Sequence, residues 1–354
     1  MKKRLVRKNK TSWLPMNIVV LIAILACTQN WCPPGNGEVK KPFALAYVDT
    51  NWKLRIRSSD DGINWTSASG ATPEIDSAPG IAPDASGVLY LAIFENAVSD
   101  AKFLTGLGPA VWDSSPFTVG DGHRNEIQSA TSVVNIGGTK YLVAYNHNNQ
   151  AKIVEFDHAT SVRDFGAEWT PVIGVVNSNL VDRPALVLRN GRLIGSWLMA
   201  NQLQMVTGDI QAGVPVWQAG YMFNANVTEQ GFGSPIGAFA LAEDGQTFYA
   251  AVVRQRDPLP GEQISHYFLF IYTSNNGLNW TRLTSRETML PTAMAIAAGG
   301  TNDIITILSN QATATSPALA YRFNGSSWTV LNNSVIFGNN PINRGHDFTL
   351  FKKH

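Results

Sequence analysis

The sequence contains very few cysteines and few charged side chains. Only two cysteines, Cys27 and Cys32, occur in 354 residues, and charged residues make up 15% of the chain. Whether the two cysteines pair with each other or Cys27 is modified, no disulfide joins distant parts of the chain. Apolar residues make up 44%, which is typical of a folded protein and excludes a disordered one. The fold therefore has to be held by its core.

The usual motifs of metal and nucleotide chemistry are also missing. The six histidines show no H-x-x-x-H pattern and no Cys/His spacing, so the sequence predicts no metal site. No G-x-S-x-G elbow and no phosphate-binding loop occur, so we expect no cofactor. No segment keeps a long helical period, which favours an all-β protein.

Positive charge is concentrated at the start of the chain. Six of the 27 basic residues precede Cys27 and none of the 26 acidic residues does, so the formal net charge of +1 hides an acidic remainder. An acidic domain repels phosphate backbones, and we therefore expect no nucleic-acid partner.

The first 26 residues resemble a bacterial export signal. A basic start is followed by an apolar run from Met16 to Ala26, which is too short to span a bilayer comfortably. The run ends in Ile24-Leu25-Ala26-Cys27, which resembles the lipobox of bacterial lipoproteins. An ordinary signal peptide and an uncleaved anchor helix are the alternatives.

The lipobox resemblance implies a domain plan and a location. Residues 1–26 form a lipoprotein-type signal peptide, Cys27 carries the lipid, and 27–41 is a Pro/Gly-rich tether. Residues 42–354 form the folded domain. The mature protein is then exported and held on a bacterial membrane by its lipid, on the outer membrane if the host is Gram-negative.

A repeated Gly–Trp unit organises the rest of the sequence. A glycine lies three or four residues before six of the ten tryptophans, which follow one another at intervals of 47 to 63 residues. This spacing is typical of four-stranded propeller blades with loops of variable length. β-rich runs introduced by a glycine turn precede the tryptophans from the second repeat onward, as in Val88–Phe94. The six pairs are Gly62–Trp65, Gly108–Trp112, Gly166–Trp169, Gly213–Trp217, Gly277–Trp280 and Gly325–Trp328.

The two ends of the chain complement each other. The first repeat begins with a second strand, Phe43–Val48, and lacks an innermost one, whereas His346–Phe351 is a spare strand at the C-terminus. Pairing them closes blade 1 and removes an exposed sheet edge. The sequence therefore predicts an all-β, six-bladed β-propeller in which the C-terminal strand closes blade 1. A pair of β-sandwiches would not explain six Gly–Trp units.

The turn of the first repeat carries a longer motif, S-x-D-x-G-x-x-W. An Asp or Asn side chain can bond backbone N–H groups of such a turn, the glycine accepts a positive φ, and the tryptophan covers the turn. The motif residues are Ser58, Asp60, Gly62 and Trp65, and an imperfect repeat over Thr273–Trp280 keeps Gly277 and Trp280. The pattern resembles the Asp box, or BNR repeat, of sialidases and related β-propellers.

The resemblance implies that ligands meet the opposite end of the blades, where the innermost strands begin. Arginines there offer bidentate donors to a carboxylate, and carboxyl groups there can act as acid and base on a glycosidic bond. The predicted substrate-binding residues are Arg124, Arg183, Arg344, His346 and Asp347. The predicted catalytic candidates are Asp76, Glu126 and Glu229. The implied function is a lipid-anchored, sialidase-like propeller that binds acidic glycans and, if it is an enzyme, hydrolyses them.

The sequence also departs from the sialidase pattern. Sialidases use a Tyr–Glu pair as nucleophile, yet no tyrosine lies at the start of the sixth inner strand, over Leu290–Ala293. The Arg-Ile-Pro motif is missing too, and Asn343–His346 takes its place. The charged residues can equally form ion pairs between blades. The alternative function is a non-catalytic propeller that binds a glycan or a protein partner, for instance through aromatic residues such as Trp52 and Tyr221.

Overall fold

The structure is a computed structural model. The residues that it describes are 43–75, 79–95, 100–107, 111–119, 132–148, 150–159, 164–171, 184–199, 202–223, 227–262, 264–309, 318–338 and 348–352. They belong to one compact unit, Lys41–His354. Within these ranges no helix has both the length and the apolar character needed to cross a membrane.

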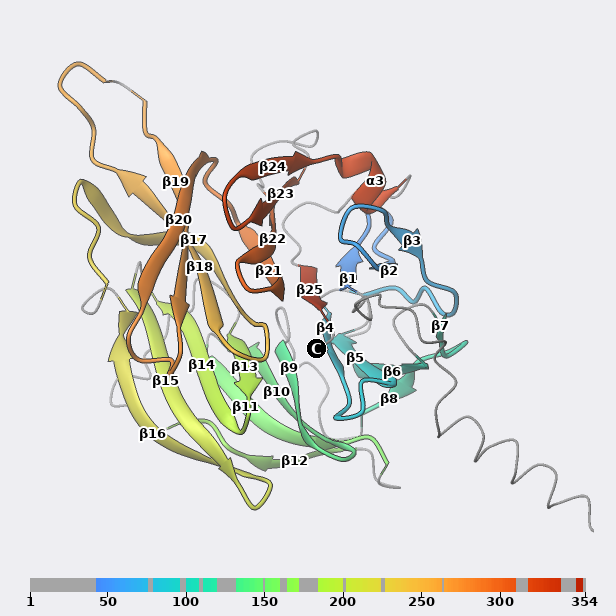
Figure 1. Cartoon of the computed structure of the whole chain (residues 1–354). Helices are drawn as coiled ribbons and strands as arrows, with labels where there is room; N and C mark the ends of the chain where they lie inside the picture. Colours follow the sequence, from blue (N-terminus) through green and yellow to red (C-terminus); the bar gives the residue numbers. More distant parts are fainter. Residues whose placement is uncertain are drawn as a thin grey trace, which may run out of the picture. The chain divides into compact units, whose positions relative to one another are not determined.

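Six antiparallel sheets make up this unit (Figure 1). From the innermost strand outward, blade 1 consists of β25 (Phe348–Lys352), β1 (Phe43–Val48), β2 (Leu54–Ser59) and β3 (Thr66–Ser67). Blade 2 consists of β4 (Gly80–Pro83), β5 (Leu89–Glu95), β6 (Ala101–Leu107) and β7 (Val111–Trp112), with β8 (Phe117–Thr118) also paired to β6. Blade 3 consists of β9 (Ser132–Gly137), β10 (Lys140–His147), β11 (Gln150–Asp157) and β12 (Phe165–Glu168).

The second half of the chain repeats this order. Blade 4 consists of β13 (Ala185–Arg189), β14 (Arg192–Met199), β15 (Gln202–Gln211) and β16 (Val214–Met222). Blade 5 consists of β17 (Phe232–Glu243), β18 (Phe248–Arg256), β19 (Tyr267–Ser274) and β20 (Thr281–Thr288). Blade 6 consists of β21 (Ala293–Gly300), β22 (Asp303–Ser309), β23 (Leu319–Asn324) and β24 (Trp328–Leu331), followed by the short helix α3 (Asn333–Phe337).

The innermost strands form a closed ring. Each contacts the next in the order β25, β4, β9, β13, β17, β21 and back to β25, and these strands surround the centre of Figure 1. The C-terminal strand pairs with β1, with Leu350 opposite Leu45. The predicted six-bladed β-propeller and its closure by the last strand are therefore confirmed. Because the ring is complete within residues 43–352, the domain holds its core by itself.

The positions of the tryptophans explain why the repeat is visible in the sequence. All six lie in, or directly beside, the outermost strand of their blade. The second strands, such as β1 and β18, are buried along almost their whole length. A strand covered on both faces reads as a continuous apolar run rather than as an alternating one.

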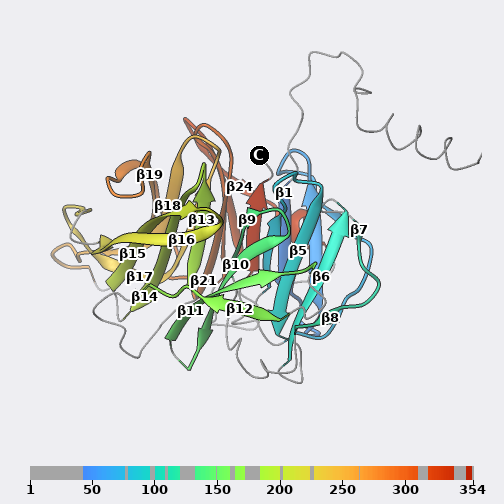
Figure 2. The same ribbon diagram turned by 90° about the horizontal axis from the view of Figure 1, so that it is seen from below.

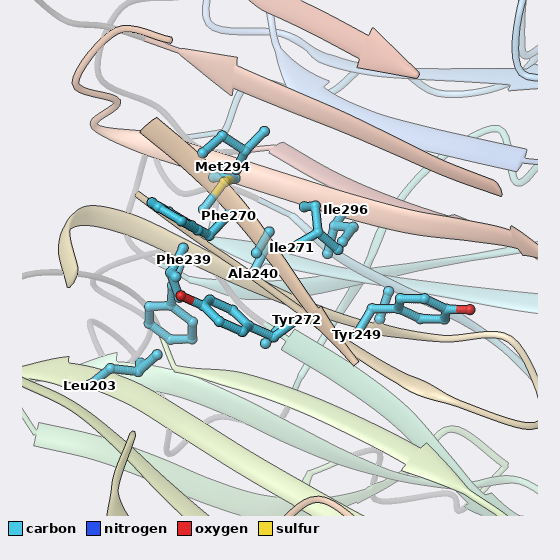
Figure 3. Close-up of a cluster of buried hydrophobic side chains, with 14 of the residues drawn as sticks. Leu203, Phe239, Ala240, Tyr249, Phe270, Ile271, Tyr272, Met294 and Ile296 are labelled. Atoms are coloured by element: carbon cyan, nitrogen blue, oxygen red, sulfur yellow. The ribbon is translucent and has the colours of Figure 1, made fainter. Parts of the chain in front are cut away.

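The core lies between neighbouring blades rather than within any one of them. Buried clusters join blades 1 and 2, 2 and 3, 3 and 4, and 6 and 1, and the largest extends over blades 4 to 6. Figure 3 shows part of that cluster, with Leu203 from blade 4, Phe239 and Tyr272 from blade 5, and Met294 and Ile296 from blade 6. Burying each large apolar side chain contributes about 1.5–3 kcal/mol. The fold is therefore stabilised by packing between neighbouring blades rather than by disulfides between distant parts of the chain.

Because neighbouring strands in each blade run in opposite directions, the propeller has two different faces. Figure 2 shows the molecule turned by 90° from Figure 1, so that both faces are seen edge-on. We call the turn face the end that carries the turns between first and second strands and between third and fourth strands. We call the loop face the opposite end, where the innermost strands begin and where second strands connect to third strands. The motif that resembles an Asp box, Ser58–Trp65, lies on the turn face.

Candidate functional site

The turn between β2 and β3 of blade 1, which carries the motif that resembles an Asp box, is held by a single carboxylate. Oδ1 of Asp61 accepts the backbone N–H groups of Ile63 and Asn64, both at 2.8 Å, and the Ser59 hydroxyl at 3.0 Å. The Ser59 hydroxyl in turn accepts the N–H of Gly62 at 2.8 Å. Burial raises the pKa of the Asp61 carboxyl, but the hydrogen bonds from Asn64, Ile63 and Ser59 more than offset this and hold the pKa well below its usual value.

The two side chains that bond the turn lie one residue later in the sequence than predicted. Ser59 and Asp61 bond the turn, whereas the sequence pattern assigned these roles to Ser58 and Asp60. The chain turns only after Ser59, at the end of β2, which leaves Asp60 exposed to solvent. Gly62 adopts the predicted positive φ of 71°, and the buried Trp65 donates its indole N–H to the Gly62 carbonyl at 3.2 Å.

The imperfect repeat in blade 5 forms the same turn with an amide in place of the carboxylate. Oδ1 of Asn276 accepts the N–H groups of Leu278 at 2.9 Å and Asn279 at 3.0 Å. The Ser274 hydroxyl accepts the N–H of Gly277 at 2.9 Å, and Gly277 has a φ of 74°. The imperfect match in sequence is therefore equivalent in geometry.

Both turns dock against the preceding blade. A Cβ atom on Gly62 would lie 2.3 Å from Cδ1 of Ile305 in blade 6, and one on Gly277 would lie 2.5 Å from Cδ1 of Ile194 in blade 4. Arg322 of blade 6 also donates to the Asp61 carbonyl at 2.9 Å. The motif therefore has an architectural role.

Arginines of blade 4 likewise donate hydrogen bonds to the docked turn of blade 5. Arg192 of blade 4 donates from Nε to the Asn276 carbonyl at 3.3 Å, and Arg189 donates to the neighbouring Asn275 carbonyl. At both junctions, a guanidinium group from one blade thus holds the turn of the next.

Glu229 is the one predicted catalytic candidate within the described residues. It precedes β17, and its Oε1 accepts the Tyr272 hydroxyl at 3.1 Å while its Oε2 accepts Arg282 Nη1 at 2.8 Å. These partners lie on the third and fourth strands of blade 5. Glu229 is therefore fixed against the outer part of its blade, and it is not among the residues that line the central cavity.

Tyr272 forms a Tyr–Glu pair that the sequence did not reveal. The hydrogen bond joins the third strand of blade 5 to the segment before β17, 43 residues earlier in the chain. No local sequence motif therefore predicts it. The Tyr272 side chain is fully buried. Burial raises its pKa, and the approach of the Arg254 guanidinium lowers it only in part. The phenol therefore stays protonated at neutral pH.

The other predicted site residues lie outside the described part of the chain, and their roles stay predictions. They are the catalytic candidates Asp76 and Glu126, the substrate-binding candidates Arg124, Arg183, Arg344, His346 and Asp347, and the lipidation site Cys27. The signal peptide and the tether lie outside it as well.

Two charged side chains near the loop face, Asp49 and Arg254, have structural roles. Asp49 is fully buried, and its Oδ1 accepts the N–H groups of Asn51 at 2.8 Å and Lys53 at 3.0 Å. Arg254 is 3% exposed and donates to the carbonyl of Val227 at 2.9 Å. Asp49 satisfies backbone groups of its own loop, and Arg254 satisfies carbonyls of a segment more than 20 residues earlier, so neither is free to bind a ligand.

Trp52 is the large aromatic side chain that the loop face presents to solvent in blade 1. It lies in the loop between β1 and β2, has a φ of 59°, and is 45% exposed. The Asp49 bonds described above tighten this loop. Two ion pairs flank it, Lys53 with Glu74 at 2.7 Å and Arg55 with Asp49 at 2.6 Å. The indole is thus an apolar surface surrounded by hydrogen-bonding groups.

The innermost strands enclose a central cavity of about 640 Å³, large enough for a small ligand. All six blades contribute to its wall, which exposes polar and apolar surface in similar amounts. Among the described residues, no group of three or more His, Cys, Asp and Glu side chains is arranged to hold a metal ion. The polar side chains at its rim are Asp84, Ser86, Asn135, Asn190 and Glu243.

Comparison with known proteins supports the fold. No protein-family model matches the sequence, and no curated protein matches it either. A fucose-specific lectin from Aleuria aurantia is similar in structure, with a TM-score of 0.51 and 15% identity over 86% of this chain and 92% of that chain. A second structure of a lectin from this fungus, described as a six-bladed β-propeller, has a TM-score of 0.51 and 14% identity over 88% of this chain and 98% of that chain.

TolB from Acinetobacter baumannii is similar as well, with a TM-score of 0.51 and 12% identity over 89% of this chain and 67% of that chain. At such identities the likeness shows a shared architecture. The chain is thus a six-bladed β-propeller, and the sialidase resemblance stays a prediction.

Proposed function

We propose that this protein is a lectin-like, non-catalytic propeller that binds glycans through its loop face and is held on a bacterial membrane by a lipid on Cys27. The observation that carries the non-catalytic assignment is the state of the Tyr272–Glu229 pair. Both carboxylate oxygens of Glu229 accept hydrogen bonds, and the tyrosine is buried with a raised pKa. A nucleophile needs access to substrate, and the fully buried Tyr272 side chain does not have it.

Two observations support a glycan as the ligand. The architecture is shared with lectins whose names state that they are fucose-specific. The loop face also presents the half-exposed indole of Trp52 next to the partly exposed ion pair of Lys53 and Glu74. Sugar rings combine apolar C–H faces with hydroxyl groups, so a rigid aromatic surface flanked by polar groups is complementary to them.

The glycan proposal is tested with the domain that begins at residue 41. A glycan array that includes fucosylated and acidic glycans measures binding, and a panel of chromogenic glycosides measures hydrolysis. We expect saturable binding without turnover. Trp52→Ala should weaken binding at least tenfold, because it removes the aromatic surface. The matched control is Ile63→Ala, which removes a residue of similar exposure from the turn face and should leave binding unchanged.

Two results would contradict the proposal. Hydrolysis of an acidic glycoside that Glu229→Gln abolishes would favour the sialidase-like enzyme instead. Failure of every glycan to bind, together with capture of a defined protein by the loop face, would favour a protein-binding module.

The lipid anchor has its own test. Cys27→Ser should abolish incorporation of a labelled fatty acid and release the protein from the membrane fraction, because the thiol that carries the lipid is lost. Cys32→Ser is the matched control and should change neither result. Continued membrane association of Cys27→Ser would indicate an uncleaved anchor helix instead.

A further inference from the structure

The chain enters the propeller at its turn face. β1 is the second strand of blade 1, so its first residue, Phe43, lies at the end of the blade that carries the turns. Phe43 pairs with Ser59, directly before the turn of blade 1, and its ring lies 3.0 Å from the position that a Cβ on Gly62 would take. The predicted tether, residues 27–41, ends two residues before this point.

The turn face of blade 2 presents a row of apolar side chains to solvent. Leu89, Leu107 and Val111 lie on three neighbouring strands, with Leu89 opposite Leu107 and Leu107 opposite Val111. Residues directly opposite each other in an antiparallel sheet place their side chains on one face, about 5 Å apart. Leu107 is 69% exposed and Val111 is 53% exposed. Val88, in the turn before Leu89, is 55% exposed and extends the row.

Blade 1 adds a further exposed apolar side chain near this row. Ile63, in the turn beside Phe43, is 50% exposed. The chain that follows this turn reaches blade 2 at Ser69, which pairs with Val111 and accepts the N–H of Trp112 at 3.0 Å. Ser69 lies six residues after Ile63, and six residues span at most about 20 Å. The exposed apolar residues of blades 1 and 2 are therefore close to one another and to the entry of the chain.

This concentration of apolar side chains distinguishes blades 1 and 2 from the others. We call Ile63, Val88, Leu107 and Val111 the apolar patch. Within the described ranges, the turns on the turn face of blades 3 to 6 carry no large apolar side chain of comparable exposure. Those turns instead expose residues such as Asn190, Gln246 and Ser326. Single exposed apolar residues are ordinary, whereas a group of them marks an interaction surface.

A lipid on Cys27 would hold this end of the domain close to the membrane. A flexible chain of about 15 residues has a root-mean-square end-to-end distance of about 20 Å. A folded domain of this size has a diameter of roughly 50 Å. The tether is therefore short enough to keep the turn face nearest to the lipids, and apolar side chains that enter the boundary of a bilayer gain free energy by leaving water.

We propose that the apolar patch contacts the membrane surface and orients the domain, with the turn face toward the lipids and the loop face away from them. The proposal rests on the lipid anchor proposed above, because the tether brings the patch to the membrane. Asp60 and Asp61 precede Ile63 in its turn, so a zwitterionic lipid surface suits the patch better than an anionic one. In this orientation the loop face is open to glycans.

The test uses the domain that begins at residue 41, which contains no cysteine, with a histidine tag at its N-terminus. Vesicles of phosphatidylcholine with a nickel-chelating lipid hold the tag. A spin label on the lipid headgroups quenches a bimane fluorophore attached to one introduced cysteine. We expect at least threefold stronger quenching at Leu107→Cys than at Ile264→Cys, an exposed residue of the loop face. Equal quenching at the two positions would overturn the proposal.

Two matched double variants separate contact by the apolar patch from proximity to the tag. Leu107→Asp/Val111→Asp should lower the quenching of a bimane at Ile63→Cys at least twofold, because the new charges keep the patch in water. Leu259→Asp/Ile264→Asp makes the same change at two similarly exposed residues of the loop face and should leave the quenching unchanged. Circular dichroism checks that both variants are folded. Equal quenching in the two variants would overturn the proposal.

The vesicles supply their own anchor, so this test does not depend on the modification of Cys27. Contact by the apolar patch without fatty-acid labelling of Cys27 would refute the lipid anchor alone. Labelling of Cys27 together with equal quenching at both faces would refute the membrane contact alone. Self-association of the domain in analytical ultracentrifugation, if Leu107→Asp/Val111→Asp abolished it, would assign the patch to a second copy of the chain and overturn the proposal.

Discussion

Four of the Gly–Trp turns can be compared glycine by glycine, and they form two kinds of junction. Gly62 and Gly277 press against an isoleucine of the preceding blade, so that neither has room for a Cβ. Gly213 and Gly325 share the positive φ, yet a Cβ on Gly213 would meet nothing within 4 Å, and one on Gly325 would only reach ordinary contact with Asn302. The same Gly–Trp feature therefore makes a tight interblade contact at Gly62 and Gly277 but not at Gly213 and Gly325.

The difference lies in the residues around the glycine. In the docked turns a Ser hydroxyl accepts the glycine N–H, and an arginine of the preceding blade donates to a carbonyl. An Asn side chain that bonds the turn backbone is not the difference, because Asn324 does the same in the Gly325 turn. Because bonds within the turn fix its backbone, the carbonyls of Asp61 and Asn276 point toward the arginine of the preceding blade. The Asp-box motif therefore marks where a turn is used to join blades, at the junctions 6–1 and 4–5.

The largest expected effect comes from adding one methyl group at a docked glycine. Gly62→Ala places a Cβ in a left-handed conformation, which costs about 1 kcal/mol, and forces Ile305 and Phe43 to move in a packed core, which costs about 1–3 kcal/mol more. We expect a total loss of about 2–4 kcal/mol in the free energy of unfolding, measured by urea denaturation followed by tryptophan fluorescence.

Gly213→Ala is the control for this substitution. It has a similar φ, 79° against 71°, and open space around the new methyl group, so only the conformational cost of about 1 kcal/mol should remain. Equal losses at the two positions would show that docking against the preceding blade contributes nothing.

The next largest effect is expected from Arg322→Ala. This arginine binds both oxygens of Asp303, at 2.8 and 2.9 Å, and donates to the Asp61 carbonyl of blade 1. The hydrogen bond to Asp303 raises the pKa of the guanidinium, so the group stays charged. A single hydrogen bond to a charged group contributes about 1.5–3 kcal/mol, and solvent screens the Asp303 pair, whose side chains are about a quarter exposed. We therefore expect a total loss of about 1–3 kcal/mol.

Arg282→Ala serves as the comparison, since the Arg282 side chain is 52% exposed and surface ion pairs contribute about 0–1 kcal/mol. Denaturation of the two variants under the same conditions checks the difference. If Arg322→Ala were as mild as Arg282→Ala, the arginine would not hold the junction.

The smallest effect is a dependence on pH that should distinguish the two docked turns. The folded pKa of Asp61 lies below that of the unfolded chain, about 3.9, so its contribution is present above that value and is lost as pH falls below it. Asn276 does not titrate. Asp61→Asn should therefore cost less than about 1 kcal/mol at pH 7 and should flatten the stability curve below about pH 4.

Asn276→Asp is the reverse experiment. It should add a stabilising component that disappears below about pH 4, because the new carboxylate would accept the same N–H groups as Asp61. The free energy of unfolding of Asp61→Asn and Asn276→Asp, measured from pH 2 to 7, tests this prediction. A parallel shift of both curves, without a change of slope, would contradict the equivalence of the two turns.

Much of the fold was predictable because it repeats. The Gly–Trp spacing and the missing strand before Phe43 predicted six blades and closure by the C-terminus, and the strands confirm both. The site was predictable to a much smaller degree. Glu229 was chosen as a catalytic candidate by its place before an inner strand, a role that stays a prediction, and its partners Tyr272 and Arg282 lie more than 40 residues away. Pairings between distant strands leave no local pattern in one sequence.

The sequence by itself determined the architecture, because blade length and the apolar character of the second strands are properties of consecutive residues. Tertiary structure decided which turns join blades, that the Tyr272 hydroxyl is buried against Glu229, and that residues of all six blades line one central cavity. Each of these depends on the distance between residues far apart in the chain, and that distance exists only once the ring has closed.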